Sequence, residues 1–378
     1  MPDAAKVAFY APMKSPDHLA PSGDRTMARL LLEALRRAGF KPELASRLRT
    51  WDRAGDAAFQ AAARRDSALE ADRLLARWTG APSHERPRLW FTYHVYYKAP
   101  DWIGPHVADA LRIPYVVAEG SRAGRRAAGP WALGNAGAEA ALARADAVLV
   151  MTEADREALE RSRPEAQRLL DLPPFLDPGE WDIASPALRG GGTDVRLLTV
   201  AMMRTGDKLE SYRILAKALA RVADEGWTLD VVGGGEARGE VERLFAAFGS
   251  RVAFHGRVDD RIALARLYDA ADILVWPAVN EAYGMVLLEA QGFGCPVLAG
   301  AYGGVASVVR DGETGVLTPP GDVAAFAEAL GRLLRDGAAR RALGQAARAF
   351  AVGERGLDRA AARLRDALMP LLAGAGSP

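Results

Sequence analysis

Two glutamates lie eight positions apart in the stretch EAYGMVLLEAQGFGCPVLAGAYGG, which runs from Glu281 to Gly304. The stretch is typical of a short loop, a helix, a strand and a glycine turn, with the helix beginning near Tyr283 or Gly284. Because the first N–H groups of a helix have no partner within it, they can hold a phosphate. Glu289 would lie one to two turns into the helix, near whatever is attached to that phosphate. The pattern therefore predicts a sugar-nucleotide site, with the anion on backbone amides and hydroxyl groups on the carboxylates.

Two cations follow a predicted strand in the segment MMRTGDK, at Arg204 and Lys208. They would lie at the carboxyl edge of a parallel sheet, which is where open α/β sheets bind ligands. Arginine offers a planar fork to an anion and lysine a compact point charge. Two cations in a loop are commonly just solvated, but next to the Glu281 turn they are predicted to face a diphosphate.

A second glycine turn, VVGGGEAR, joins a predicted strand to a helix at Val231–Arg238. It invites a dinucleotide interpretation, but Arg238 occupies the position of the last glycine in G-x-G-x-x-G counted from Gly233. An NAD-dependent oxidoreductase is therefore disfavoured. The alternative is a tight strand-to-helix turn, against whose backbone a phosphate or sugar could lie.

Acid–base candidates are few. The five histidines show no metal-ligand spacing and no Asp-x-Asp is present, so no metal site is predicted. His94 ends the strand-like segment WFTYH, and Glu119 ends YVVAE. Because parallel strands end at the same edge, both are candidate site residues, although a lone histidine is more often structural. No nucleophile elbow or phosphate-binding P-loop occurs.

Composition limits the class of protein. A chain of 378 residues is too long for one ordinary core, so two domains are expected. The net charge of +1 gives no bulk attraction to nucleic acid. The single cysteine, Cys295, suits a reducing cytosol. No segment approaches the ~20 apolar residues of a membrane-spanning helix.

Strand and helix patterns alternate twice along the chain, which predicts an α/β fold with parallel sheets. The first alternation covers residues 1–176 and the second 195–354, separated by a Pro- and Gly-rich linker at 177–194. Residues 355–378 hold a final helix, at about Gly356 to Ala373. It either returns to the first domain or is an ordinary amphipathic C-terminal helix.

The residues of the second half resemble the retaining glycosyltransferases of family four, which have the two-domain GT-B architecture. The resemblance rests on the Glu-x7-Glu spacing of Glu281 and Glu289, the pair Gly303-Gly304, the segment DGETGVLTPPGD, the segment FHGRV and the loop of Arg204 and Lys208. It is strong over about Leu197 to Asp322 and weaker in the first half. It implies two Rossmann-like domains whose parallel sheets face a central cleft.

Site roles follow from this resemblance. Glu289 would bind the ribose, and Glu281 would act at the donor sugar as a catalytic residue. Arg204 and Lys208 would neutralise the diphosphate in place of a metal. The remaining donor contacts would come from backbone at Tyr283, Gly284, Met285 and Val286, from Arg257 and Val258 at the base, and from Gly23 in an N-terminal loop that closes over the phosphates.

Three departures from the family pattern concern the first half and the cations. Gly23 is followed by Asp24 where the family usually has two glycines, and Arg204 and Lys208 are one residue closer than usual. Glu119 stands where many members have a histidine. Either Glu119 or His94 could then serve the acceptor, so both are predicted as catalytic candidates.

The resemblance implies a metal-independent hexosyltransferase without a cofactor, using a nucleotide-diphosphate sugar as donor. The acceptor would be a glycan, a lipid-linked molecule or a small molecule, and nucleic acid is not expected. The chain would be cytoplasmic, with peripheral contact at the inner membrane face as an alternative. Other functions left open are a sugar-nucleotide-binding protein without transfer activity and a GT-B-like epimerase.

Overall fold

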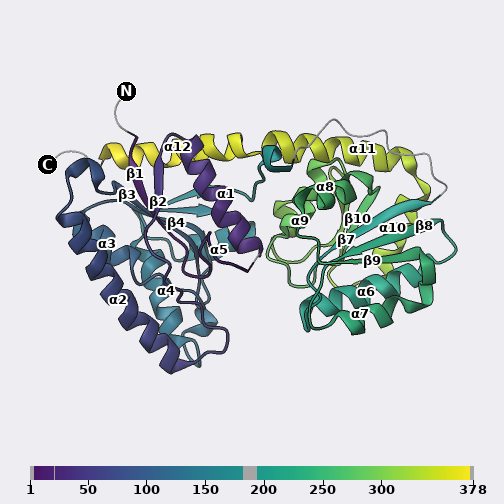
Figure 1. Ribbon diagram of the computed structural model, residues 1–378, viewed down its shortest axis with the longest axis horizontal. Helices are drawn as coiled ribbons and strands as arrows, with labels where there is room; N and C mark the ends of the chain where they lie inside the picture. Colours follow the sequence, from purple (N-terminus) through teal and green to yellow (C-terminus); the bar gives the residue numbers. More distant parts are fainter. Residues whose placement is uncertain (1–3, 21, 182–193, 375–378) are drawn as a thin grey trace. The chain divides into compact units, whose positions relative to one another are not determined.

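The computed structural model describes residues 4–20, 22–181 and 194–374 (Figure 1). The chain divides into two compact units. Unit 1 contains the residues up to Pro173 and those from Leu357 onward, and unit 2 contains Pro174–Gly356. The expected boundaries were at 176, 194 and 354, and most of the expected linker, residues 182–193, lies outside the described residues.

Unit 1 is built on a six-stranded parallel sheet in the order β2-β1-β3-β4-β5-β6. Its central strands are almost entirely buried, as expected for parallel strands covered on both faces. The strands are β1 (Lys6–Tyr10), β2 (Lys41–Leu44), β3 (Leu89–Val95), β4 (Tyr115–Gly120), β5 (Ala147–Val150) and β6 (Arg168–Asp171).

Helices cover this sheet in two groups. One face packs on the second, third and fourth helices around Trp78, Trp90 and Leu142. The first helix packs instead with the last, where Arg37 pairs with Asp358 at 2.7 Å. The helices of unit 1 are α1 (Gly23–Arg37), α2 (Ala57–Thr79), α3 (Gly104–Leu111), α4 (Ala132–Arg144), α5 (Glu153–Arg161) and α12 (Leu357–Gly374).

Unit 2 repeats the plan with a six-stranded parallel sheet in the order β12-β11-β10-β7-β8-β9. The order reverses at β7, so loops after β7 and β10 meet at the switch point where such sheets bind ligands. The strands are β7 (Val195–Val200), β8 (Trp227–Val232), β9 (Val252–Gly256), β10 (Ile273–Trp276), β11 (Val297–Gly300) and β12 (Gly315–Thr318).

The helices of unit 2 begin at clear local signals. The helices α8 and α10 are capped by Asp260 and Asp322, whose carboxylates accept from backbone N–H groups in the first turn. The helices are α6 (Asp207–Arg221), α7 (Arg238–Phe245), α8 (Arg261–Ala270), α9 (Met285–Gly292), α10 (Val323–Arg335) and α11 (Gly337–Arg348).

The two-sheet α/β architecture expected from the alternating pattern is confirmed. Two strands were missed, β6 and β12. The first is a half-exposed edge strand of four residues, and the second lies inside a segment rich in glycine and proline. Residues Val305–Ser307, in an element expected at 305–309, form a short 3-10 turn.

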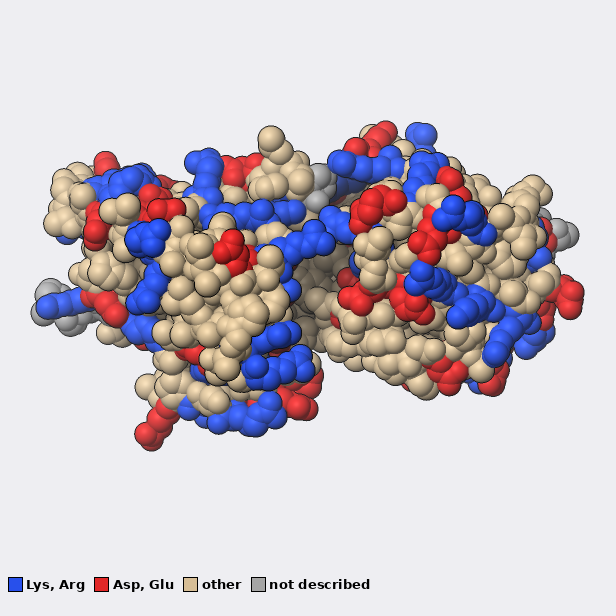
Figure 2. All heavy atoms as spheres, turned by 90° about the horizontal axis from the view of Figure 1, so that it is seen from below, with Lys and Arg blue, Asp and Glu red and all other residues tan. Residues whose placement is uncertain are grey.

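Charged side chains of both signs are interspersed over the face shown in Figure 2, without a broad surface of one sign. This distribution agrees with the net charge of +1. Among the helices in the described part of the chain, none is both long enough and apolar enough to cross a membrane.

Candidate functional site

Lys208 and Glu281 form an ion pair at the carboxyl edge of the unit 2 sheet. Lys208 is the second residue of α6, and Glu281 lies in the loop between β10 and α9. Trp276 Nε1 donates to Glu281 Oε2 at 3.3 Å, and Lys208 Nζ lies 5.4 Å from the centre of the Trp276 ring. The side chains of the pair keep 25% and 19% of their surface exposed, so both remain accessible to a ligand.

The Glu281 loop is held by the start of α6. The Val279 N–H donates to Ser211 Oγ at 3.0 Å, and Asn280 Nδ2 donates to Asp207 Oδ1 at 2.9 Å. Asn280 has a positive φ of 49°, a conformation that asparagine tolerates better than most residues. The predicted meeting of the cation loop and the glutamate turn is therefore realised by direct contacts.

Glycine is required beside this loop for steric reasons. A Cβ on Gly303 would lie 2.3 Å from the Glu281 carbonyl oxygen, and Gly303 has a φ of 49°. The next residue, Gly304, donates its N–H to the Ala282 carbonyl at 2.6 Å. The glycine pair thus lets the β11 loop support the backbone that carries Glu281.

The helix α9 begins at Met285, one or two residues later than expected. Gly284 precedes it with a φ of 75°, and the Leu287 N–H donates to the Gly284 carbonyl at 3.0 Å. Tyr283 and Met285 are buried and Val286 is half-buried. The amide groups at this end of α9 are those predicted to hold the donor.

Glu289 is half-buried in the second turn of α9 and accepts a hydrogen bond from Tyr268 Oη at 2.9 Å. Burial raises the pKa of Glu289 to about 7, although the Tyr268 bond and the Arg261 guanidinium act to lower it. The second carboxylate oxygen, Oε1, has no hydrogen bond with the described residues. Glu289 and Glu281 therefore have different partners within unit 2.

The other predicted donor residues of unit 2 lie in exposed loops. Arg204 is exposed after β7, and its side chain has no ion pair with the described residues. Arg257 follows β9 and pairs with Asp259 at 2.7 Å, while its neighbour Val258 is half-buried. Among the residues that the structure describes, no group of three or more His, Cys, Asp or Glu could hold a metal ion.

The glycine turn after β8 has a structural explanation. A Cβ on Gly233 would lie 1.8 Å from the Ala201 carbonyl oxygen, and one on Gly235 would lie 2.3 Å from that of Met203. The Met203 N–H donates to the Gly234 carbonyl at 2.9 Å. These glycines let the β8 loop pack on the β7 loop, which supports the tight-turn alternative over a dinucleotide site.

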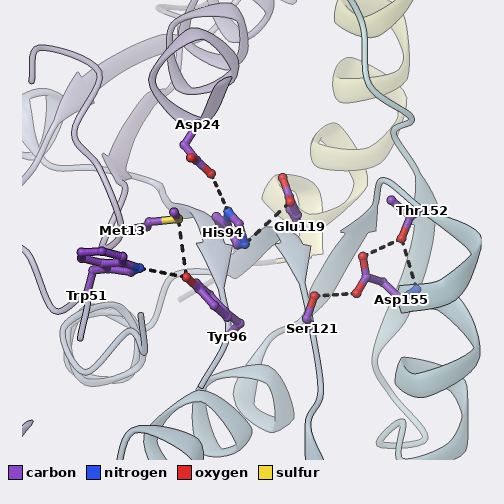
Figure 3. Close-up of polar contacts among 9 residues, drawn as sticks. All are labelled: Met13, Asp24, Trp51, His94, Tyr96, Glu119, Ser121, Thr152 and Asp155. Carbon is purple, nitrogen blue, oxygen red and sulfur yellow. Dashed lines mark hydrogen bonds and ion pairs between the residues drawn. The ribbon is translucent and has the colours of Figure 1, made fainter. Parts of the chain in front are cut away.

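In unit 1 the structure brings His94 and Glu119 together and adds Asp24, which the sequence reasoning missed as a partner (Figure 3). His94 Nδ1 lies 3.1 Å from Asp24 Oδ1, and His94 Nε2 lies 3.7 Å from Glu119 Oε1. Asp24 comes from the first turn of α1. The imidazole therefore lies between two carboxylates from different elements.

His94 and Glu119 have backbone φ values of 64° and 60°, in a region that residues with side chains rarely adopt. They occupy matching positions, because Tyr93 pairs with Ala118 and Val95 with Gly120 across the two strands. Such strain costs about 1–3 kcal/mol per residue and persists only where the surroundings enforce it. The matched distortion turns both side chains toward the same point.

Charge determines the state of this imidazole. Burial alone would lower the pKa of His94, but Glu119 and Asp24 raise it to about 9. Burial raises the pKa of Glu119, and the charges of Asp24 and Asp155 act in the same direction. His94 is therefore protonated at neutral pH and can donate hydrogen bonds, but it cannot serve as a base.

Further side chains fix the surroundings of His94. The Tyr96 ring lies 4.7 Å from the imidazole, and Trp51 Nε1 donates to Tyr96 Oη at 3.0 Å. On the other side, Ser121 Oγ donates to Asp155 Oδ1 at 2.5 Å. Gly23, predicted as a donor-binding residue, is the exposed first residue of α1. Apart from its chain neighbours and its own helix backbone, no atom of the described residues lies within 4 Å of where its Cβ would be.

The protonated His94 should make the folded protein less stable as the pH becomes alkaline. Because the folded pKa of His94 is about 9 against an ordinary 6.5, its stabilising contribution is complete below about pH 6.5 and lost as pH rises through about 9. The loss amounts to ~3 kcal/mol. Between about pH 7 and pH 10, the midpoint temperature of thermal unfolding should fall more in the wild type than in His94→Gln.

The control for this comparison is His106→Gln, which removes an exposed histidine on α3. In this variant the unfolding temperature should fall with rising pH as steeply as in the wild type. Equal slopes in the wild type and His94→Gln would contradict a charged His94.

Comparison with known proteins finds a family match within unit 2. Residues 194–336 match the family model described as glycosyl transferases group 1. A D-inositol 3-phosphate glycosyltransferase from Xylanimonas cellulosilytica is 35% identical over 248 residues, covering 61% of this chain and 58% of the relative. One of the same name from Geodermatophilus obscurus is 35% identical over 217 residues, covering 52% of this chain and 47% of the relative. The chain thus spans about half the length of these curated relatives.

Solved structures resemble the chain over almost its whole length. Sucrose-phosphate synthase from Thermosynechococcus elongatus has a TM-score of 0.75 at 23% identity, with 98% of this chain and 100% of that one covered. HepE of Anabaena, solved with UDP, has a TM-score of 0.70 at 16% identity, with 97% and 100% covered. Residues 194–336 therefore match a glycosyltransferase family model, and the chain has the two-domain GT-B fold of these solved structures.

Proposed function

We propose that this chain is a retaining glycosyltransferase that moves a sugar from a nucleoside-diphosphate sugar to an acceptor hydroxyl. The observation that carries the proposal is the Lys208–Glu281 pair beside the N-terminus of α9, inside the matched family domain. HepE, a neighbour in fold, has been solved with UDP and with UDP-glucose. Those ligands make UDP-glucose a reasonable first donor to test.

On the donor side, the polar groups divide by chemistry. The backbone amides from Tyr283 to Val286, at the start of α9 and just before it, would hold phosphate and sugar, because an open helix N-terminus favours anions. Lys208 and the exposed Arg204 would balance the charge of the leaving diphosphate. Glu281 would accept hydrogen bonds from donor-sugar hydroxyls and Glu289 from ribose hydroxyls. The backbone at Arg257 and Val258 would meet the base.

On the acceptor side, His94 and Glu119 would act together. The gap of 3.7 Å between Nε2 and Oε1 is too long for a direct hydrogen bond but suits a bridging hydroxyl. Such a hydroxyl would accept from the His94 N–H and donate to the Glu119 carboxylate. Because the Glu119 carboxylate borders this point, an uncharged hydroxyl group fits it better than a phosphate.

The chemistry needs no protein nucleophile. The bond between the anomeric carbon and the diphosphate oxygen breaks as the bond to the acceptor oxygen forms on the same face, through an oxocarbenium-like state. The acceptor proton passes to the departing phosphate oxygen, so charge and protons balance. The main work of the protein is to position the reactants and stabilise charge.

Metal independence is tested by chelation. Because Lys208 and Arg204 would supply the positive charge at the diphosphate, transfer should continue in excess EDTA. The measurement is UDP release from UDP-glucose, with and without the chelator. Loss of activity in EDTA that magnesium or manganese restores would contradict the role of these two cations.

A panel of nucleotide sugars tests the proposed donor class. A ligand present at about 100 times its dissociation constant should stabilise the protein by ~2.7 kcal/mol, which a thermal-shift assay detects. UDP-glucose, UDP-N-acetylglucosamine, GDP-mannose and ADP-glucose are suitable probes. A shift without turnover in any acceptor mixture would favour a binding protein, and isomerised donor would favour an epimerase.

The acceptor and the location of the protein stay predictions. The curated relatives are named for D-inositol 3-phosphate, which makes that compound and unphosphorylated inositol the first pair to compare. A lipid-linked acceptor, with the protein at the inner membrane face, is tested by co-sedimentation with vesicles.

A further inference from the structure

Tyr268 is a buried residue of α8 that makes a hydrogen bond to Glu289, the residue predicted to bind the ribose. Its side chain is 0% exposed, and its Oη donates to Glu289 Oε2 at 2.9 Å. The two residues lie on different helices, α8 and α9. This bond uses Glu289 Oε2. The other carboxylate oxygen, Oε1, has no hydrogen bond to the described residues, and the side chain is half-buried.

Aromatic packing holds the Tyr268 ring in place. The ring stacks on Phe293, with centroids 5.6 Å apart and planes 18° apart. Trp181 meets it edge-on at 5.7 Å, and the Arg261 guanidinium lies 5.0 Å from the centre of the Trp181 ring. Because the ring is enclosed by other rings, its hydroxyl has a defined position from which to orient the carboxylate.

The charge state of Glu289 matters for ribose. An ionised carboxylate can accept from both ribose hydroxyls, whereas the neutral acid uses one oxygen as a donor. Burial raises the pKa of Glu289 to about 7, Tyr268 and Arg261 act to lower it, and Glu180 acts to raise it. Glu180 pairs with Arg261 at 2.5 Å, so these two charges partly cancel.

We propose that Tyr268 is a positioning residue for donor recognition, because its hydroxyl orients the Glu289 carboxylate and favours the ionised form that accepts both ribose hydroxyls. This inference rests on the proposed function, in which Glu289 binds the ribose. Tyr268 itself touches no substrate. Its effect is exerted through Glu289 alone.

Nucleotide binding should depend on pH. Below about pH 7 Glu289 gains a proton, so nucleotide binding should weaken as pH falls and level off above the pKa of about 7. Tyr268→Phe removes a hydrogen bond to the charged form, so the midpoint should move to higher pH. At pH 7 the variant should bind the nucleotide roughly tenfold more weakly.

The test is calorimetric titration of the full chain with UDP, ADP and GDP, continued with whichever of the three binds most tightly. Titrations run from about pH 6 to pH 8, either side of the Glu289 pKa of about 7. Glu289→Gln should bind roughly tenfold more weakly and without this pH dependence, since the amide does not titrate. The control is Tyr10→Phe, which removes a buried tyrosine hydroxyl that donates to the Leu48 carbonyl in unit 1. It should bind the nucleotide as the wild type does.

A second readout separates positioning from mere packing. The wild type should prefer the ribonucleotide over its 2′-deoxy analogue, and Tyr268→Phe should reduce that preference. A folded Tyr268→Phe variant with the midpoint and the preference of the wild type would overturn the inference. If Tyr268→Phe does not fold, Phe293→Leu, which loosens the ring but keeps the hydroxyl, should produce a smaller shift in the same direction, and no shift would overturn the inference.

Failure of the inference and failure of the proposed function are distinguishable. If Glu289→Gln weakens binding but Tyr268→Phe does not, only the role of Tyr268 is wrong. If Glu289→Gln binds as the wild type does, or no nucleotide binds the wild type, the ribose assignment itself is wrong.

Discussion

Replacing Lys208 with alanine should lower the turnover number roughly 10²–10³-fold, the range observed when one preorganised charge-stabilising donor is removed. In the proposed reaction, negative charge develops on the departing diphosphate. Lys208 is the half-buried cation that pairs with Glu281 at the carboxyl edge of the sheet. The loss should be larger than for a surface charge, because the ammonium is already held by Glu281 and the Trp276 ring. The measurement is steady-state UDP release at saturating donor.

The matched control is Lys217→Ala, which removes an exposed lysine from the same helix, α6. It should leave turnover close to that of the wild type. Lys208→Arg should recover part of the rate, because charge is kept but the shape of the cation changes. A Lys208→Ala variant with the turnover of Lys217→Ala would contradict the assignment of the leaving-group cation.

Glu281→Gln should reduce turnover roughly 10²–10⁴-fold, because two hydrogen bonds between sugar hydroxyls and a charged acceptor are each worth about 1.5–3 kcal/mol. Binding of free UDP should change little, since Glu281 is predicted to face the sugar and not the nucleotide. Turnover and UDP affinity are measured on the same preparation. A loss of turnover without a loss of UDP affinity would distinguish the role of Glu281 from that of Glu289. Replacing Glu289 should weaken UDP binding directly.

The control for Glu281 is Glu240→Gln, which breaks an ion pair with Arg213 on the surface of unit 2. It should be nearly silent, because exposed ion pairs contribute little. Equal losses of turnover and UDP affinity in Glu281→Gln would mean that the residue supports the whole loop. Because Lys208 and Glu281 touch, their effects should also be non-additive in the double variant.

Local patterns carried much of the prediction for unit 2. The Glu-x7-Glu spacing, the glycines around it and the strand before Arg204 act over short distances in the chain, so the loop, α9 and the cation loop could be predicted together. The helix α9 begins at Met285 and not at the predicted Tyr283 or Gly284, because Gly284 adopts a left-handed conformation before the helix. The loops that hold Lys208 and Glu281 follow β7 and β10, which are neighbouring parallel strands, so both loops begin at the same edge of the sheet.

The contacts in unit 1 were harder to predict. Asp24 and His94 are separated by 70 positions, and nothing local indicates that the first turn of α1 reaches the end of β3. The positive φ values of His94 and Glu119 also have no local signal, because neither residue is a glycine or an asparagine. Tyr268 was missed for a similar reason: within α8 it has the pattern of an ordinary core residue.

The resemblance left the choice between His94 and Glu119 open, and the structure relates the two residues to each other. His94 lies between Asp24 and Glu119, so the two acidic departures from the family pattern flank one imidazole. A protonated His94 that donates and a Glu119 that accepts would share one hydroxyl. Replacing either residue alone should therefore weaken the binding of the acceptor and leave UDP binding unchanged.

The reaction that we propose is transfer of a sugar with retention of its anomeric configuration. The most direct measurement is proton NMR of the reaction with an α-linked nucleotide sugar selected by the thermal-shift panel, followed at the anomeric proton of the product. We expect an α-linked product that forms in EDTA together with the released nucleoside diphosphate. Lys208→Ala should not form this product at a comparable rate. A β-linked product, or release of free sugar and diphosphate with every acceptor offered, would contradict the proposed reaction.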